Sequence, residues 1–201
     1  MINDQPLLKN ITIATISLLL TLASPAALSG DIEAGRLLAA VCNHCHLDNN
    51  SSSIPKISGQ HENYLAEQML AYRSGKRKDK IMETVVSRLK GESDISDLAA
   101  YYASLPPVAD NKTTQQNSLG HDVFRNKIRC DQCHGANGEG NPLAKPIIPA
   151  IAGQNKDYIV KRLMEFQTQG PHQVPNSPMP QVAKQLDIID IFSVSEYVND
   201  M

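Results

Sequence analysis

The chain has 201 residues and is close to charge balance, with 19 Lys and Arg against 21 Asp and Glu and a formal net charge of −2. A nucleic-acid-binding protein normally shows a strongly basic face, so this composition excludes that class. Aromatic residues are few, with no Trp, three Phe and six Tyr, and the length allows one domain or two small ones.

The amino-terminal segment has the layout of a secretory signal peptide. Lys9 precedes an apolar run over residues 11–22, and small residues follow that run. Cleavage after Ala26 and cleavage after Ser29 both fit the pattern. The alternative is an uncleaved membrane anchor, although the apolar run is shorter than the roughly 20 residues that a spanning helix needs. We therefore predict a signal peptide over residues 1–29 and a periplasmic protein.

The next segment carries a short motif that occurs again later in the chain. Residues 33–41 predict a short helix that leads into Cys42-Asn43-His44-Cys45-His46. A similar helix over 119–128 leads into Cys130-Asp131-Gln132-Cys133-His134. Both strings read CxxCH, the attachment pattern of c-type haem, in which two thiols bond to the haem and the histidine lies under the iron.

Four cysteines also allow other chemistry, because they could form disulfides, act as redox dithiols or bind zinc. A four-thiolate zinc site usually spaces its two CxxC pairs about 15–20 residues apart, whereas most of a domain separates Cys45 from Cys130. Disulfides and dithiols would not require a histidine after each second cysteine. The sequence therefore predicts two covalent haems c, held by Cys42, Cys45, His46, Cys130, Cys133 and His134.

The similarity between the two halves extends well beyond the cysteines. Residues 54–60, IPKISGQ, recur at 148–154 as IPAIAGQ, and each string leads into an amphipathic helix that reaches Gly75 or Gly170. Glycine is the usual residue at a left-handed helix end. The apolar positions of the two helices match in pairs, which align Tyr64, Leu65, Met69 and Tyr72 with Tyr158, Ile159, Leu163 and Phe166.

Each half also closes with a helix. Ser93 is the predicted cap of the first, whose apolar face is formed by Leu98, Tyr101, Tyr102 and Leu105. We predict an all-α protein with domain 1 over 30–106, a linker over 107–118 and domain 2 over 119–201. Domains this small bury limited cores, so we expect each haem to supply apolar mass and haem-free variants not to fold.

A sixth iron ligand is expected opposite each histidine, and thioether sulfur suits an electron-transfer haem. Met69 and Met164 each align with a leucine in the other half, so neither needs its sulfur and both read as core residues. Met82 and Met179 align with each other, each in a predicted loop seven residues before a leucine. Met82 and Met179 are therefore the predicted ligands.

The two prolines of the repeated strings are candidates for the residues that accept a hydrogen bond from the histidines. An iron-bound histidine usually donates its second ring proton to a carbonyl or a carboxylate. Pro55 and Pro149 follow the haem motifs at comparable distances and could present such a carbonyl. A plain turn proline explains the same pattern.

Basic residues gather just before Met82. They form either a solvated loop or a patch that steers an acidic partner towards the first haem. The residues concerned are Arg73, Lys76, Arg77, Lys78 and Lys80.

Taken together, the duplicated CxxCH units, the repeated IPxIxGQ-type strings, the Tyr-bearing helices and the two late methionines resemble the dihaem cytochromes of the cytochrome c4 family, over about residues 30–201. The resemblance implies two tandem class I cytochrome c folds related by a pseudo-twofold axis, each wrapped around one His/Met-ligated haem. It also implies that Pro55 and Pro149 accept the histidine hydrogen bonds. One departure is Leu47, which replaces the glycine usually found after the first CxxCH, whereas Gly135 keeps it. The chain path near the first haem is therefore expected to differ.

The same resemblance implies a periplasmic electron carrier that is not an enzyme. Its partners would be redox proteins, such as a bc1-type donor and a terminal oxidase or dehydrogenase, with no nucleic acid and with room for peripheral membrane association. Two other functions remain open. One is a dihaem relay subunit of a dehydrogenase, such as a sulfide-oxidising flavocytochrome. The other is a dihaem peroxidase-type enzyme, although the chain is short for that class and two matched methionines favour closed iron sites.

Overall fold

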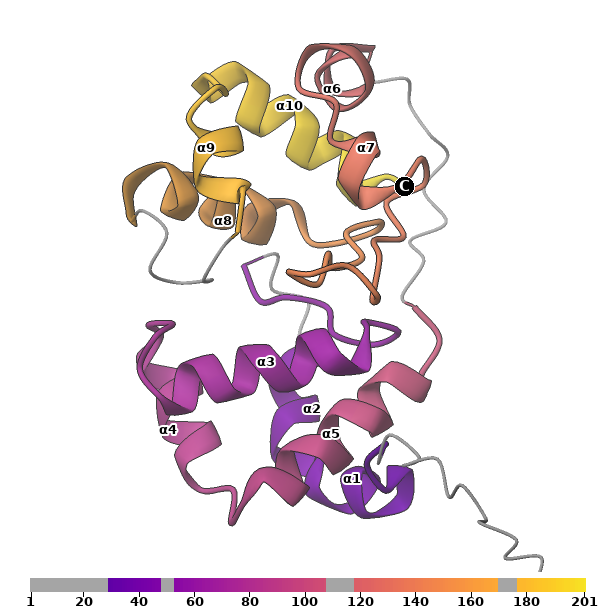
Figure 1. Ribbon diagram of the computed structural model, residues 1–201, viewed down its shortest axis with the longest axis vertical. Helices are drawn as coiled ribbons and strands as arrows, with labels where there is room; N and C mark the ends of the chain where they lie inside the picture. Colours follow the sequence, from indigo (N-terminus) through magenta and orange to yellow (C-terminus); the bar gives the residue numbers. More distant parts are fainter. Residues whose placement is uncertain (1–28, 48–52, 108–117, 170–176) are drawn as a thin grey trace, which may run out of the picture.

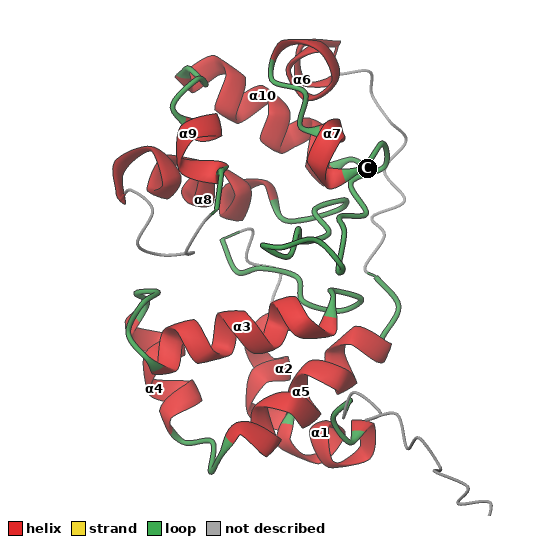
Figure 2. Ribbon diagram, in the orientation of Figure 1, coloured by secondary structure: helices red, strands yellow, loops and turns green. Residues whose placement is uncertain are grey.

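The computed structural model describes most of the chain, namely residues 29–47, 53–107, 118–169 and 177–201. The predicted signal segment apart from Ser29, and the predicted linker apart from Pro107 and Ser118, lie outside these ranges. Two helical bodies, one from each half of the chain, lie end to end (Figure 1). Within the described ranges the only strand-like pairing is an isolated bridge between Asn141 and Ile148 (Figure 2). The all-α prediction is confirmed.

The first body is built from the helices of the first half, which are α1 (Ile32–Leu38), α2 (Ala40–His46), α3 (Glu62–Arg73), α4 (Lys80–Ser87) and α5 (Glu92–Ser104). Asp31 caps α1 by accepting the N–H groups of Glu33 and Ala34 at 2.9 and 3.1 Å. A single helix was expected over 33–41, but a break at Ala39 divides it into α1 and α2.

Two expectations for helix ends in this body have different outcomes. Gly75 follows α3 with a φ of 69°, so the predicted left-handed helix end is confirmed. The predicted cap at Ser93 is wrong, because α5 begins at Glu92 and Gly91 holds the cap position. The carboxylates of Glu92 and Asp94 in the first turn interact favourably with the positive end of the helix dipole, so the helix start does not need a hydroxyl cap.

The second body follows the same plan with α6 (Ser118–Asp122), the π-helical turn η1 (Val123–Lys127), α7 (Asp131–His134), α8 (Lys156–Gln169), α9 (Met179–Ala183) and α10 (Ile188–Asn199). Its first and last helices pack together as α1 and α5 do, and α8 contacts α9 and α10 as α3 contacts α4 and α5. The π-helical turn is tied to α10, because Lys127 Nζ donates to the buried carboxylate of Asp190 at 2.7 and 2.8 Å.

Small apolar cores hold these helices together. In the first body, one core contains Ala39, Leu65, Leu98, Ala99 and Tyr102, and a second contains Tyr72, Val86 and Ile95. The core of the second body contains Val123, Phe124, Val160, Leu163, Leu186, Ile191, Val194 and Val198. The described parts of the loops that follow the two CxxCH motifs, residues 53–61 and 135–155, lie between the bodies and face each other (Figure 2).

The crossing of α1 and α5 depends on the absence of a side chain at Gly35. A Cβ atom built there would lie 2.0 Å from the backbone oxygen of Asp97 and 2.8 Å from Cβ of Tyr101. Backbone cannot move aside as a flexible side chain can, so only glycine permits this close approach.

We expect Gly35→Ala to lower the free energy of unfolding of the first body by about 3 kcal/mol, because the added methyl overlaps the backbone of α5. Denaturant unfolding followed by far-ultraviolet circular dichroism measures the loss. Gly91→Ala is the matched control, since the nearest atom to its Cβ would be Ser93 Oγ at 3.7 Å. Equal stability of the two variants would contradict the close crossing.

Candidate functional site

Helix α2 carries the whole first CxxCH motif. One helical turn therefore separates Cys42 from Cys45, and His46 is the last residue of the helix. Cys42 is half-buried and packs against the first core of its body. Tyr102 of α5 anchors the helix by donating from its hydroxyl to Oδ1 of Asn43 at 2.7 Å.

The second motif is built differently around the same three functional residues. Cys130 precedes the short helix α7, and its carbonyl accepts the backbone N–H of His134 at 2.8 Å. Gly135 then turns the chain with a φ of 82°. Leu47, at the corresponding place in the first unit, has a φ of −112° and continues in helical geometry. The expected difference in chain path after the two motifs is therefore present.

Both histidines are fixed by the carbonyls of the two repeated prolines. His46 Nδ1 lies 2.8 Å from the oxygen of Pro55, and His134 Nδ1 lies 3.0 Å from the oxygen of Pro149. A carbonyl only accepts, so Nδ1 carries the proton in each ring and Nε2 keeps its lone pair. Burial also lowers the pKa of both histidines, against the opposing effect of the proline carbonyls. Each ring is thus a neutral imidazole oriented as a metal ligand would be.

The two predicted methionine ligands lie in helices and not in loops. Met82 is in the first turn of α4, where Asp79 Oδ1 accepts its N–H at 3.1 Å, and Met179 is the first residue of α9. The N-cap of α9 is Pro178, and the N–H of Met179 donates to Ser177 Oγ at 3.3 Å. The loop expectation is wrong for Met82 because Asp79 provides an N-cap that the internal alignment did not reveal. It is wrong for Met179 because α9 begins at that residue, directly after Pro178.

Packing brings the predicted methionine and the first cysteine to a shared core only in the second body. Met179 and Cys130 both pack against the single core of the second body. In the first body, Cys42 packs on one core and Met82 on the other, and Met69 and Leu89 contact both. The thiol and the thioether therefore share one core in the second unit, whereas in the first unit they lie on two cores that Met69 and Leu89 join.

The thiols do not have the features of the alternative sites. All four cysteines are free in the structure. Burial raises the pKa of the Cys42 thiol, and it raises that of Cys130 to about 11, whereas redox dithiols and zinc ligands need easily formed thiolates. Within the described part of the chain, no group of three His, Cys, Asp or Glu side chains comes together to hold a metal ion. Reduced thiols, neutral histidines and apolar surroundings fit haem attachment.

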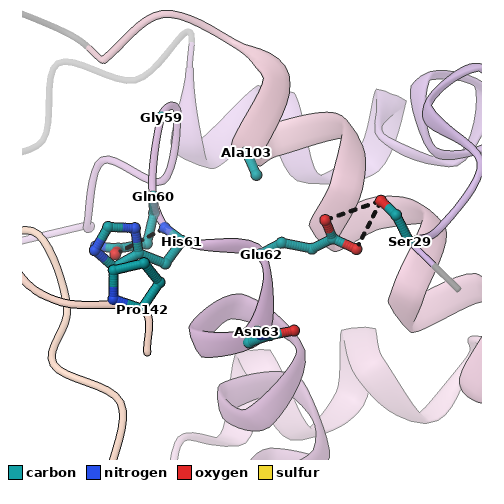
Figure 3. Close-up of a pocket in the computed structure, with 8 residues that line it drawn as sticks. All are labelled: Ser29, Gly59, Gln60, His61, Glu62, Asn63, Ala103 and Pro142. Carbon is teal, nitrogen blue, oxygen red and sulfur yellow. Dashed lines mark hydrogen bonds between the residues drawn. The ribbon is translucent and has the colours of Figure 1, made fainter. Parts of the chain in front are cut away.

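Two hollows lie where the bodies meet, and no predicted site residue lines either of them. One, of about 390 Å³, is lined by residues that include Gln60 and Glu62 of the first unit and Pro142 of the second (Figure 3). Glu62 accepts hydrogen bonds from Ser29 Oγ at 3.0 and 3.1 Å there. The other, of about 700 Å³, lies between α3 and residues 142–147. Neither hollow contains the residues expected to bind haem.

Only part of the basic cluster is a solvated surface. Arg77 is 6% exposed, and its guanidinium donates to Gln68 Oε1 at 2.7 Å and to the Tyr158 hydroxyl of the second unit at 3.0 Å. Arg73 donates to backbone carbonyls that follow α4. The exposed members are Lys76, Lys78 and Lys80. The arginines are therefore structural, because they satisfy buried acceptors.

Sequence reasoning missed the Tyr102–Asn43 hydrogen bond. Asn43 occupies one of the variable positions of CxxCH, and only the fold brings it beside α5. The second unit has Asp131 there, which lies 3.5 Å from Arg129 Nε and 4.0 Å from Arg125 Nη1. No signal in the sequence links residues so far apart.

Repeated in two helical bodies of one chain, this arrangement is that of a dihaem c-type cytochrome, which transfers electrons. The chain is 33% identical to cytochrome c4 of Azotobacter vinelandii over 208 residues, which cover 94% of this chain and 98% of that protein. The crystal structure of reduced recombinant cytochrome c4 from Pseudomonas stutzeri matches with a TM-score of 0.74 and 28% identity, over 86% of this chain and 99% of that one. The chain belongs to the cytochrome c4 family.

Two further comparisons complete this picture. A thiosulfate dehydrogenase electron acceptor of Stutzerimonas stutzeri is 25% identical, over 79% of this chain and 78% of that protein. No family model matches the chain.

Cys42→Ala combined with Cys45→Ala is expected to remove one haem and to unfold the first body, because its small cores lose the apolar mass of the cofactor. Intact mass and far-ultraviolet circular dichroism of periplasm-matured protein measure both effects. His44→Ala is the matched control, since His44 is exposed in the same motif. A one-haem variant that keeps full helix content and one cooperative melt would contradict the expectation.

Proposed function

We propose that this protein is a periplasmic electron carrier in which His46 and Met82 ligate one iron and His134 and Met179 the other. Haem iron, when bound, alternates between the ferrous and ferric states and so passes one electron at a time. The observation that carries the proposal is the pair of Nδ1-anchored histidines, because each leaves Nε2 available in a fixed direction.

The residues around each site would keep the geometry constant while the charge on the iron changes. The proline carbonyl holds the imidazole plane, and backbone hydrogen bonds to Asp79 and Ser177 hold the two methionines. Filled axial positions leave no place for a substrate, so we propose that the protein is not an enzyme. Rapid cyanide binding to the resting protein would count against this conclusion.

The methionine assignment is tested by Met82→Ala and Met179→Ala. We expect each variant to lose half of the near-infrared sulfur-to-ferric-iron band, and the potential of the affected haem to fall because thioether ligation raises it. Optical spectra combined with a redox titration measure both.

Met69→Leu and Met164→Leu are the controls for this experiment. Both residues pack in the cores of their units, and both align with leucine in the internal repeat. The full band should remain in each control. A full band in Met82→Ala or Met179→Ala would overturn the assignment.

We propose export as the route to the periplasm, on the strength of the amino-terminal apolar run. That run lies outside the described residues. Where the chain is described, no helix is long and apolar enough to cross a membrane. Sequencing the amino terminus of the mature protein would show whether residues 1–29 are removed.

We further propose that Lys76, Lys78 and Lys80 steer acidic redox partners. Similarity to an electron acceptor of thiosulfate dehydrogenase is compatible with docking on a dehydrogenase as well as with free diffusion. Stable co-purification with a dehydrogenase would identify the docked form.

The lysine proposal predicts that oxidation by the ferricyanide anion slows about threefold as salt screens the exposed charges. Lys76→Gln with Lys78→Gln should reduce both the rate and its salt dependence, measured by stopped-flow. Lys156→Gln with Lys184→Gln changes the net charge equally on the second unit and serves as the control. The same salt dependence in both double variants would remove the steering role.

A further inference from the structure

The side chain of the glutamine that ends each IPxIxGQ string makes hydrogen bonds to the other unit. Gln60 and Gln154 are both buried, at 8% and 9% exposure. Neither contacts a predicted ligand of its own unit through its side-chain amide. Each Oε1 accepts the next backbone N–H of its own unit, from His61 or Asn155, and both amides are also bonded to backbone of the opposite unit.

The two crossings are reciprocal. Gln154 Oε1 accepts the N–H of Lys56 at 2.8 Å, and its Nε2 donates to the oxygen of Lys56 at 2.9 Å. Gln60 Oε1 accepts the N–H of Ala150 at 3.0 Å, and its Nε2 donates to the oxygen of Ala150 at 2.8 Å. Each side-chain amide therefore pairs with one residue as a neighbouring β-strand would, and the pattern obeys the internal twofold repeat.

The residue to which each glutamine is hydrogen-bonded directly follows the proline whose carbonyl accepts from the histidine, so the two residues share a peptide group. The N–H of Lys56 and the carbonyl of Pro55 belong to one peptide, which accepts His46 Nδ1–H on one side and donates to Gln154 on the other. The peptide between Pro149 and Ala150 joins His134 to Gln60 in the same way. One planar group thus links each histidine to the opposite unit.

Hydrogen bonds in such a chain strengthen one another. A peptide whose N–H is engaged carries more negative charge on its oxygen, so it accepts more strongly from the imidazole. When the carbonyl accepts the Nδ1 proton more strongly, the ring gains imidazolate character and Nε2 becomes a better electron donor. A better donor stabilises ferric iron.

We propose that Gln60 and Gln154 are positioning residues for the histidine of the opposite unit, so that each unit sets the potential of the other unit's haem. This inference rests on the axial assignment proposed above. It makes the contact between units part of the redox chemistry and gives the repeated glutamine a function that packing alone does not require.

The test replaces the amide by an apolar group of similar length. In Gln154→Met we expect the potential of the haem at His46 to rise by about 28 mV, a threefold change in its one-electron equilibrium, with little change at the other haem. Gln60→Met should show the reverse pattern. Redox titration followed by the haem methyl resonances, assigned to each unit by NMR, separates the two potentials.

A matched control removes a different contact between the units. Asn155 Nδ2 donates to the oxygen of Ile54, which is not part of the Pro55–Lys56 peptide that donates to Gln154. Asn155→Leu should therefore move neither potential by a comparable amount. If Gln154→Met does not fold, Gln154→Asn withdraws the amide by one methylene and keeps a polar side chain at the interface.

The outcomes are distinct. A shift confined to the haem of the mutated unit, equal shifts of both haems, or no shift would overturn the inference. Faster exchange of the His46 Nδ1 proton in reduced Gln154→Met would support it independently. Loss of a haem or of the sulfur-to-iron band in the unmutated protein would instead defeat the proposed function.

Discussion

The hydrogen bond from each histidine to a prolyl carbonyl is the constraint on which the rest of the arrangement depends. It selects the ring tautomer, because a carbonyl can only accept, and it fixes the ring plane relative to the helix that carries the cysteines. It also determines where the loop after each CxxCH motif must return. That return brings residues 54–60 and 148–154 to the boundary between the bodies, so one contact sets both the local site and the interface.

The two units make the same hydrogen bonds at the residues expected to hold the cofactor and differ in the contacts around them. Histidine, proline and glutamine occupy corresponding positions and make corresponding hydrogen bonds in both units. The supports of the CxxCH helices differ: a tyrosine hydroxyl binds Asn43 in one, whereas arginines flank Asp131 in the other. The two CxxCH sites therefore share their ligand geometry but differ in their surroundings.

Much of this fold follows from local patterns, and the parts that do not are long-range. The CxxCH motifs, the amphipathic helices and the helix end at Gly75 depend on residues a few positions apart, so the sequence alone predicts them. The division of the first helix at Ala39 and the start of α5 at Glu92 depend on tertiary packing and on end effects that periodicity does not capture. Met82 was expected in a loop, because the cap at Asp79 becomes evident only from the backbone geometry.

The role of the repeated glutamines becomes evident only from the structure. In the sequence they only signal that two halves are related. Buried polar side chains are normally hydrogen-bonded, and the oxygen and the nitrogen of each amide here both bond to the other unit's backbone. An apolar residue would fill the same space but would remove the two hydrogen bonds that the amide makes to the N–H and carbonyl of Lys56 or Ala150. The same bonds that make glutamine necessary for the contact lead directly to the carbonyl that each histidine uses, so assembly of the units and tuning of the iron ligands share one peptide group.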